Sequence, residues 1–288
     1  MATSTEFHQF TQNIEIPQVT EENRTMLEGL LTLVECKKAL ALFGSGKSPG
    51  EDGFTVEFYT EFFDILGIDL VESLNSTYEK GHLSISQRRG VITLLPKEES
   101  PLIKLKNWRP ITLLNVDYKI ASKAIARRIE PMLPHLIHAD QTGFIKGRYI
   151  GENIRLINDL MEQTNATKIP GVLLTLDFRK AFDTLEWSFI QYALQKFNFG
   201  EGIRRWVEIF YNDVDSTILD NGFATNWIKP TRGVRQGCPL SPFLFVLSAE
   251  LMANKIRQSH LIKGVSLFGN EVNLSPTQHY LTLNLKSN

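Results

Sequence analysis

Hydrophobic and polar residues alternate along this chain with two different periods. Apolar positions spaced three and four residues apart predict helices over 20–43, 54–80, 116–133, 151–164, 184–197, 202–212 and 243–258. Two short apolar runs, 90–96 and 171–177, predict strands, and residues 214–229 predict a hairpin that turns at Asp220-Asn221-Gly222. Residues 1–19 are polar and irregular and predict a loose, disordered arm. The mixture of helices and strands predicts an α+β or α/β fold.

Composition narrows the class of protein. The chain has 288 residues, of which 42% are hydrophobic and 22% charged, a balance that excludes a disordered chain. Cys36 and Cys238 are far apart and have no metal-binding spacing, which favours a reducing, intracellular compartment, either cytoplasm or nucleus. No apolar run is long enough for a membrane span, and the first residues lack the pattern of a signal peptide, so we expect no membrane partner.

Charge is segregated along the chain although the formal net charge is only −1. Residues 1–70 carry 12 acidic and 4 basic residues, a net charge of −8. Residues 88–130 carry 10 basic and 4 acidic residues, a net charge of +6. The basic block points to a phosphate-rich partner, and a solvated helical face is the alternative.

The segment Gly44-Ser45-Gly46-Lys47-Ser48 imitates the end of a phosphate-binding loop. The full motif requires a glycine at position 41, where this chain has Ala41. The segment also follows a predicted helix rather than a strand, and Pro49 bars Ser48 from helical geometry. We therefore reject an NTPase function.

Asp177 ends the apolar run 171–177. A carboxylate at the end of a buried strand is costly unless something compensates it, and a hard divalent cation such as Mg²⁺ would do so. The alternative is that Asp177 caps the helix that follows.

Two further stretches carry candidate chemistry. Gly233 and Gly237 flank Arg235 and Gln236, which leaves backbone open to a ligand just before a helix N-terminus. Lys97 follows one strand, and Arg109 lies where a hairpin could bring both cations onto a triphosphate. An ordinary strand-to-helix loop and ordinary surface charge are the respective alternatives.

These stretches, in this order, resemble the reverse transcriptase of non-LTR (LINE-type) retrotransposons. The resemblance runs from about residue 20 to about residue 274. The stretches that carry it are 47–54, 94–97, 107–119, 140–144, the block around Asp177, and 233–242.

The resemblance implies an α+β fold of the right-hand polymerase type, with fingers and an incomplete palm and with the thumb missing. Residues 20–150 would form the N-terminal extension and fingers, and residues 151–274 a partial palm. Residues 275–288 would be an aberrant C-terminal tail.

The resemblance also implies the chemistry, which is the copying of RNA into DNA by two-metal nucleotidyl transfer. The implied cofactor is Mg²⁺, two ions in the intact site, and the implied partners are an RNA template, a DNA primer and dNTPs. Asp177 matches the catalytic, metal-binding aspartate, and Phe178 matches the residue whose backbone carbonyl also reaches a metal.

Other matched positions concern the incoming nucleotide. Lys97 and Arg109 match the residues that hold its triphosphate, and Phe182 matches the residue that screens out a ribose 2′-hydroxyl. Gln236 and Gly237 match the loop beside the nucleotide and template. From their charge and spacing, we further expect four residues of one helix to lie along template phosphates: Lys119, Lys123, Arg127 and Arg128.

The sequence departs from the family after residue 275. The family has a Tyr/Phe-Ala-Asp-Asp block there, but no aspartate follows Asp220 and no acidic residue follows Glu271. One aspartate cannot hold two Mg²⁺ ions at catalytic spacing, so we expect this chain alone not to polymerise. A non-catalytic RNA- or DNA-binding remnant of a retroelement is the alternative. A chain that fails to close its sheet, with an unpaired strand edge from Val172, is another.

Overall fold

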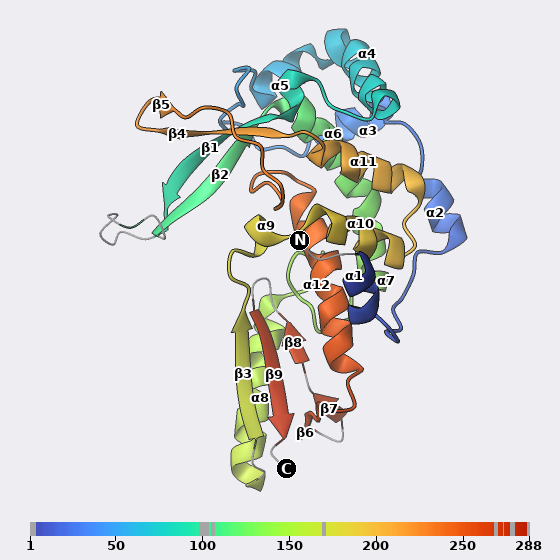
Figure 1. Ribbon diagram of the computed structural model, residues 1–288, viewed down its shortest axis with the longest axis vertical. Helices are drawn as coiled ribbons and strands as arrows, with labels where there is room; N and C mark the ends of the chain where they lie inside the picture. Colours follow the sequence, from blue (N-terminus) through green and yellow to red (C-terminus); the bar gives the residue numbers. More distant parts are fainter. Residues whose placement is uncertain are drawn as a thin grey trace.

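A mixed sheet of four strands lies on one side of the molecule, in the order β2-β1-β4-β5 (Figure 1). The computed structural model describes residues 4–97, 104, 107–168, 171–267, 270–272, 274–276 and 280–286. β1 runs antiparallel to β2 and parallel to β4, and β4 runs antiparallel to β5. The strands are β1 (Arg89–Pro96), β2 (Trp108–Leu114), β4 (Asp215–Asp220) and β5 (Phe223–Ala224). The mixed α+β architecture predicted from the sequence is confirmed.

A layer of helices packs beside this sheet and contains the main hydrophobic core. α6 is its most deeply buried member, because Tyr118, Ile120, Ala121 and Ile125 are almost fully inaccessible to solvent. Its helices include α3 (Leu33–Leu40), α4 (Val56–Lys80), α5 (Ile85–Arg88), α6 (Val116–Ile129), α10 (Trp187–Lys196), α11 (Glu201–Tyr211) and α12 (Ser241–Arg257). Most of the helices predicted from apolar spacing are therefore confirmed, with ends that differ by a few residues.

The N-terminal region differs from the sequence-based expectation. The predicted helix 20–43 is two helices, α2 (Glu21–Leu27) and α3, because Gly29 has a φ of +99° and Thr32 starts α3 with a capping box. Residues 4–10 of the predicted loose arm form α1 (Ser4–Phe10), whose Phe7 is buried against Phe189 of α10. Residues 1–3 of that arm lie outside the described part of the chain.

A second sheet, with strand order β3-β9-β8, lies beside α8 and α12 (Figure 1). β9 lies antiparallel to β3, and the backbone of Tyr280 is opposite Asp177. β3 therefore has a partner on one edge, while its other edge has no strand beside it among the described residues, as expected for the strand that begins near Val172. The elements of this region are α7 (Leu133–Leu136), α8 (Ile150–Thr167), α9 (Ala181–Thr184), β3 (Gly171–Asp177), β6 (Val265–Leu267), β7 (Asn270–Val272), β8 (Leu274–Pro276) and β9 (Tyr280–Lys286), with a 3-10 turn at Glu130–Met132.

The predicted aberrant tail 275–288 thus contributes backbone to β8 and β9, and its residues 277–279, 287 and 288 lie outside the described part. The predicted hairpin turn is confirmed, since Asn221 and Gly222 both have positive φ between β4 and β5. The prediction that the glycine-rich segment follows a helix rather than a strand is also confirmed. Residues 44–53 follow α3, and the next helix begins only at Val56.

Arg128 holds the N-terminal helices onto α6. Its guanidinium binds the Glu35 carboxylate through two nitrogens, at 2.7 and 3.0 Å, and donates to the carbonyls of Leu27, Gly29 and Leu30. Only 10% of the Arg128 side chain is exposed. Burial raises the pKa of Glu35, but hydrogen bonds from Arg128 and Thr32 outweigh burial, so the net pKa lies below its ordinary value.

Replacement of Arg128 by methionine keeps most of the aliphatic stem but removes the donor to these backbone carbonyls and leaves the Glu35 carboxylate with Thr32 as its remaining donor. We expect Arg128→Met to lower the free energy of unfolding by about 3–5 kcal/mol, the usual cost of removing one partner of a buried pair. Urea unfolding measures this, with the exposed neighbour Arg127→Met as control and an expected change within about 0.5 kcal/mol. Equal losses in the two variants would contradict the structural role of Arg128.

Candidate nucleotide-binding site

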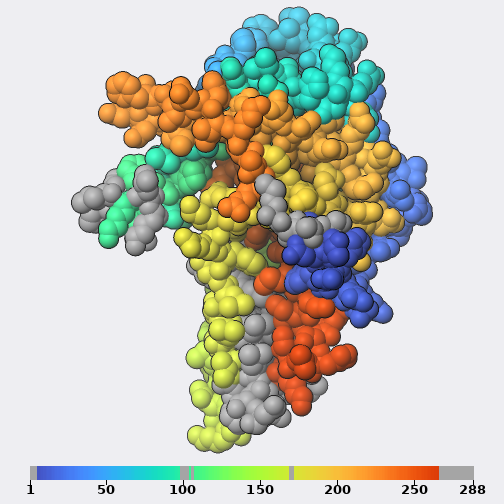
Figure 2. Space-filling view, viewed as in Figure 1, coloured from blue at the N-terminus to red at the C-terminus, as the bar shows by residue number. Residues whose placement is uncertain are grey.

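The β1–β2 hairpin brings Lys97 and Arg109 to the same face. Leu95 is paired with Arg109, and the backbone N–H of Lys97 donates to the carbonyl of Asn107 at 2.8 Å. Because side chains alternate along a strand, positions 95, 97, 107 and 109 share one side of the hairpin. Both cations are solvent-exposed, on a hairpin that projects from the body of the molecule (Figure 2). The predicted hairpin juxtaposition is confirmed.

The loop 232–242 packs along the free edge of β2. The backbone N–H of Thr112 donates to the carbonyl of Gln236 at 2.7 Å. Gly237 has a φ of +123°, and a Cβ there would lie only 2.5 Å from the carbonyl oxygen of Thr112. A side chain at position 237 would therefore collide with the strand, which makes glycine a requirement of this contact.

The same loop also packs against α9. Val234 donates its N–H to the carbonyl of Phe182 at 2.7 Å, and Gly233 donates to Leu185, also at 2.7 Å. A Cβ on Gly233, whose φ is +89°, would lie 2.8 Å from the carbonyl of Asp183. The space left by both glycines is thus filled by the chain's own backbone, which corrects the expectation that it would be open to a ligand.

The helix after this loop does not present an open N-terminus. Ser241, the first residue of α12, is only 1% exposed, and its hydroxyl donates to the carbonyl of Arg235 at 2.9 Å. Tyr211 shares the same hydroxyl at 3.2 Å. The Ser241 side chain at the start of α12 is therefore engaged in packing inside the protein.

Gln236 and Phe182 lie in two segments that the loop brings side by side. The Gln236 amide nitrogen donates to the Asp183 carboxylate at 3.0 Å. The Phe182 ring is stacked on Phe245 of α12, with ring centroids 5.3 Å apart, and Phe144 meets it edge-on at 6.2 Å. These rings fix the orientation of Phe182 from two sides. The structure therefore brings the segments of Phe182, Gln236 and Gly237 together.

Asp177 and Phe178 lie at the end of β3, next to this cluster in sequence. Phe178 packs edge-on against Phe245 at 5.7 Å, and its carbonyl accepts the N–H of Ala181 at 3.2 Å. Asp177 is exposed, and so are Val172, Leu173, Leu174 and Leu176 of β3. The prediction that this strand is buried is wrong, because β3 lies at the edge of a small sheet outside the main core.

The alternative role of Asp177 as a helix cap is also wrong. α9 begins after Lys180, and no side chain caps it. Within the described residues, no group of three or more His, Cys, Asp or Glu side chains is placed to hold a metal ion. The donor set there therefore does not fit two Mg²⁺ ions.

The four basic residues of α6 do not form one exposed row. Arg128 is turned inward on Glu35, Lys119 and Lys123 are half-buried, and Arg127 is exposed. Burial lowers the pKa of Lys119, although the nearby Asp52 carboxylate raises it. Only Lys123 and Arg127, with Lys119 beside them on the helix, remain available to a phosphate backbone.

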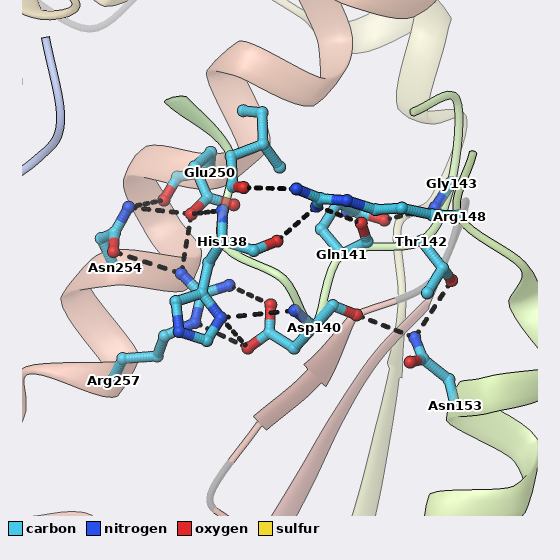
Figure 3. A network of polar contacts seen from close by, with 11 residues as sticks. His138, Asp140, Gln141, Thr142, Gly143, Arg148, Asn153, Glu250, Asn254 and Arg257 are labelled. Atoms are coloured by element: carbon cyan, nitrogen blue, oxygen red, sulfur yellow. Dashed lines mark hydrogen bonds and ion pairs between the residues drawn. The ribbon is translucent and has the colours of Figure 1, made fainter. Parts of the chain in front are cut away.

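A network of ion pairs joins the loop 138–148 to α12 (Figure 3). Arg257 binds Asp140 at 2.6 Å and Glu250 at 2.8 Å, and Arg148 donates to the carbonyls of His138, Gln141 and Ile137. Phe144 lies in this loop, and its ring contacts the Phe182 ring. The network therefore positions one side of the Phe182 cluster.

Sequence reasoning did not identify Asp183, Phe245 or Arg257 as contributors. Asp183 lies in the block around Asp177, and this position, six residues after Asp177, was the sequence feature that could have identified it. Phe245 and Arg257 occupy a helix whose sequence shows only apolar periodicity, so their partners become visible only in the fold.

Comparison with known proteins gives consistent matches. Residues 95–275 match the family described as reverse transcriptase (RNA-dependent DNA polymerase). The chain is 40% identical over 235 residues to the transposon TX1 uncharacterized 149 kDa protein of Xenopus laevis. The aligned region covers 82% of this chain and 18% of that protein. It is 31% identical over 199 residues to a retrovirus-related Pol polyprotein from the type-1 retrotransposable element R2 of Popillia japonica, with 69% and 27% coverage. The chain thus spans less than a third of either relative's length.

The contact at Gly237 gives a direct test of the loop's packing. We expect Gly237→Ala to lower the free energy of unfolding by at least about 2 kcal/mol, because it adds a clash to an unfavourable φ. Gly222→Ala is the control, since Gly222 has a φ of +82° but nothing within 4 Å of its Cβ position. That variant should lose only about 1 kcal/mol in urea unfolding. A loss at Gly237 no larger than at Gly222 would refute the close packing.

The Asp140 carboxylate gives a pH-dependent test. Burial raises its pKa, but His138 and Arg257 outweigh burial, so its net pKa is below the ordinary 3.8. Its ionised form therefore stabilises the fold above about pH 3.8, and this stabilisation is lost as pH falls through the lower folded-state value. We expect Asp140→Asn to cost about 2 kcal/mol at pH 7.

Urea unfolding of wild type and Asp140→Asn from pH 7 down to pH 3 measures this difference. It should stay constant to near pH 4 and shrink below it. Glu152→Gln, an exposed acid on α8, serves as the control with no such change. A difference independent of pH throughout would show that the Asp140 charge does not contribute.

Proposed function

Because the chain belongs to the reverse transcriptase (RNA-dependent DNA polymerase) family, we propose that it is the nucleotide-binding part of a polymerase that copies RNA into DNA. It would correspond to the N-terminal extension and fingers over residues 20–150 and to part of the palm over residues 151–274. The implied partners are an RNA template, a DNA primer and dNTPs. No helix among the described residues is long and apolar enough to cross a membrane.

The assembly around the loop 232–242 is the observation that carries this proposal. It joins Thr112, Phe182 and Gln236, which lie far apart in the sequence, through backbone hydrogen bonds of 2.7 Å. A site built from three segments and fixed by backbone contacts is preorganised, which a polymerase needs to align a nucleotide.

Each residue that the family resemblance singles out has a proposed task. Lys97 and Arg109 would hold the triphosphate, with Arg109 making paired contacts and Lys97 acting as a compact charge. Phe182, locked between Phe144 and Phe245, would pack against the sugar and exclude a 2′-hydroxyl. Gln236 and Gly237 would line the nucleotide and template, with Gln236 oriented by Asp183.

The metal chemistry of the family is only partly supported by these residues. Asp177 and the Phe178 carbonyl supply one carboxylate and one neutral oxygen, whereas two Mg²⁺ ions need further carboxylates. The backbone opposite Asp177 belongs to Tyr280, and no acidic residue follows Glu271 in the 288 residues. We therefore propose that these 288 residues alone do not incorporate nucleotides.

The basic surface of α6 supports nucleic-acid binding as a second property. Lys123 and Arg127, with Lys119, would contact template phosphates in a sequence-independent, salt-sensitive manner. This feature also favours the alternative function, a non-catalytic RNA- or DNA-binding remnant.

Two buried free cysteines, Cys36 and Cys238, are compatible with the reducing compartment predicted from composition.

A fluorescent dNTP analogue tests the nucleotide site. We expect Lys97→Met/Arg109→Met to weaken its binding by about tenfold, because two charge-assisted phosphate contacts are lost. Lys104→Met, an exposed cation of the same hairpin region, is the matched control and should change affinity less than about twofold. Fluorescence anisotropy measures all three proteins.

Primer extension on an RNA template accompanies this assay. No incorporation is expected from the 288-residue chain, and clear incorporation would contradict the proposed incompleteness of its metal site. RNA binding that is salt-sensitive, combined with dNTP binding that ignores Lys97 and Arg109, would support the non-catalytic remnant instead.

A further inference from the structure

The outer face of α4 carries large apolar side chains that the fold leaves in solvent. Phe62, Ile65 and Ile68 are 42%, 74% and 60% exposed, and Phe54, just before the helix, is 45% exposed. Phe58 joins them, with its ring centroid 4.5 Å from Phe54 and 5.2 Å from Phe62. The other side of α4 packs inward through Val56, Phe63, Val71 and Leu74.

These side chains form one stripe on the helix. Phe58, Phe62 and Ile65 are spaced at i, i+4 and i+7, and Ile68 lies one turn beyond Ile65. Figure 2 places α4 at the upper margin of the molecule, away from β3 and α8. Contiguous apolar surface of this kind on a folded protein marks an interaction site. We call Phe54, Phe58, Phe62, Ile65 and Ile68 the α4 stripe.

Acidic residues surround the α4 stripe. α4 contains six acidic residues and a single basic one, Lys80, at its last position. Glu61 lies one turn before Ile65, Asp69 one turn after it, and Glu72 one turn after Ile68. All three acids are exposed.

Other acids of the N-terminal region already form ion pairs with basic residues of the same chain. Glu35 binds Arg128, Glu51 binds Arg89 at 3.2 Å, and Asp64 binds Lys37 at 2.5 Å. By contrast, Glu61, Asp69 and Glu72 form no ion pair within the described part of the chain. The charge that remains beside the α4 stripe is therefore negative.

We propose that the α4 stripe docks a basic amphipathic helix of a protein partner. Such a helix would cover the exposed phenylalanine and isoleucine side chains with its apolar face. Its lysines and arginines would lie over Glu61, Asp69 and Glu72. The sign of the charge argues against RNA, DNA or an anionic membrane at this face, because each would be repelled.

This surface is separate from the nucleotide-binding assembly, so its role does not depend on the proposed polymerase function. The apolar side chains supply most of the affinity, since buried aromatic and aliphatic anchors dominate interfaces. The acidic rim supplies orientation and association rate, which are sensitive to salt.

A labelled synthetic amphipathic helix of leucine and lysine, about five turns long, tests the proposal by fluorescence anisotropy. Binding to the full chain is expected, with affinity falling about fivefold or more as NaCl rises from about 50 to about 500 mM. Ile65→Ser/Ile68→Ser should weaken binding about tenfold. Its matched control is Ile150→Ser/Ile154→Ser, two exposed isoleucines on α8, which should bind as wild type.

The acidic rim is tested separately with Glu61→Gln/Asp69→Asn/Glu72→Gln. This variant should bind at least about fivefold more weakly at low salt and lose most of the salt dependence. Glu22→Gln/Glu152→Gln/Glu162→Gln removes three exposed acids elsewhere and should keep both properties.

Three results would overturn the proposal. They are no binding of the basic helix, equal losses in the stripe and control variants, and direct binding of a labelled single-stranded RNA that Ile65→Ser/Ile68→Ser weakens. The last result would assign the face to nucleic acid. Circular dichroism of each variant confirms that it is folded, and all the substituted side chains are exposed.

Discussion

The backbone of residues 233–237 is the contact on which the candidate site depends. This segment lies between β2 and α9 and hydrogen-bonds to both, at 2.7 Å on each side. It can do so only because Gly233 and Gly237 adopt positive φ and carry no Cβ to strike the carbonyls of Asp183 and Thr112. The sheet and the helical layer are thereby fixed relative to each other beside Gln236 and Phe182.

Gly233 and Gly237 predict backbone that is open to a ligand, and this contact explains why that prediction is wrong. A glycine pair reports that something approaches the backbone closely, but it does not say whether the neighbour is a ligand or the chain itself. Here the neighbours are the chain's own β2 and α9. The proposed ligand-facing groups are instead the side chains that this packing orients, Gln236 through Asp183 and Phe182 through Phe245.

Local patterns predicted the elements well, and long-range partners poorly. The Asn221-Gly222 turn, the ends of α4 and the β1–β2 hairpin follow from turn chemistry, caps and periodicity, all of which act within a few residues. The burial of β3 could not be predicted, because an apolar run does not show whether a second layer covers it. Arg128 looked like a surface cation, since its partners, Glu35 and three carbonyls, lie about 100 positions away.

The segregation of charge along the sequence has two consequences in the fold. Some of these charges are paired within the chain, where acids of the N-terminal region bind cations of the basic block through Glu35–Arg128 and Glu51–Arg89. What remains is a negative surplus on α4 and a positive surplus on α6 and the β1–β2 hairpin. A net charge of −1 therefore describes neither surface, and each selects its partner by its own local sign.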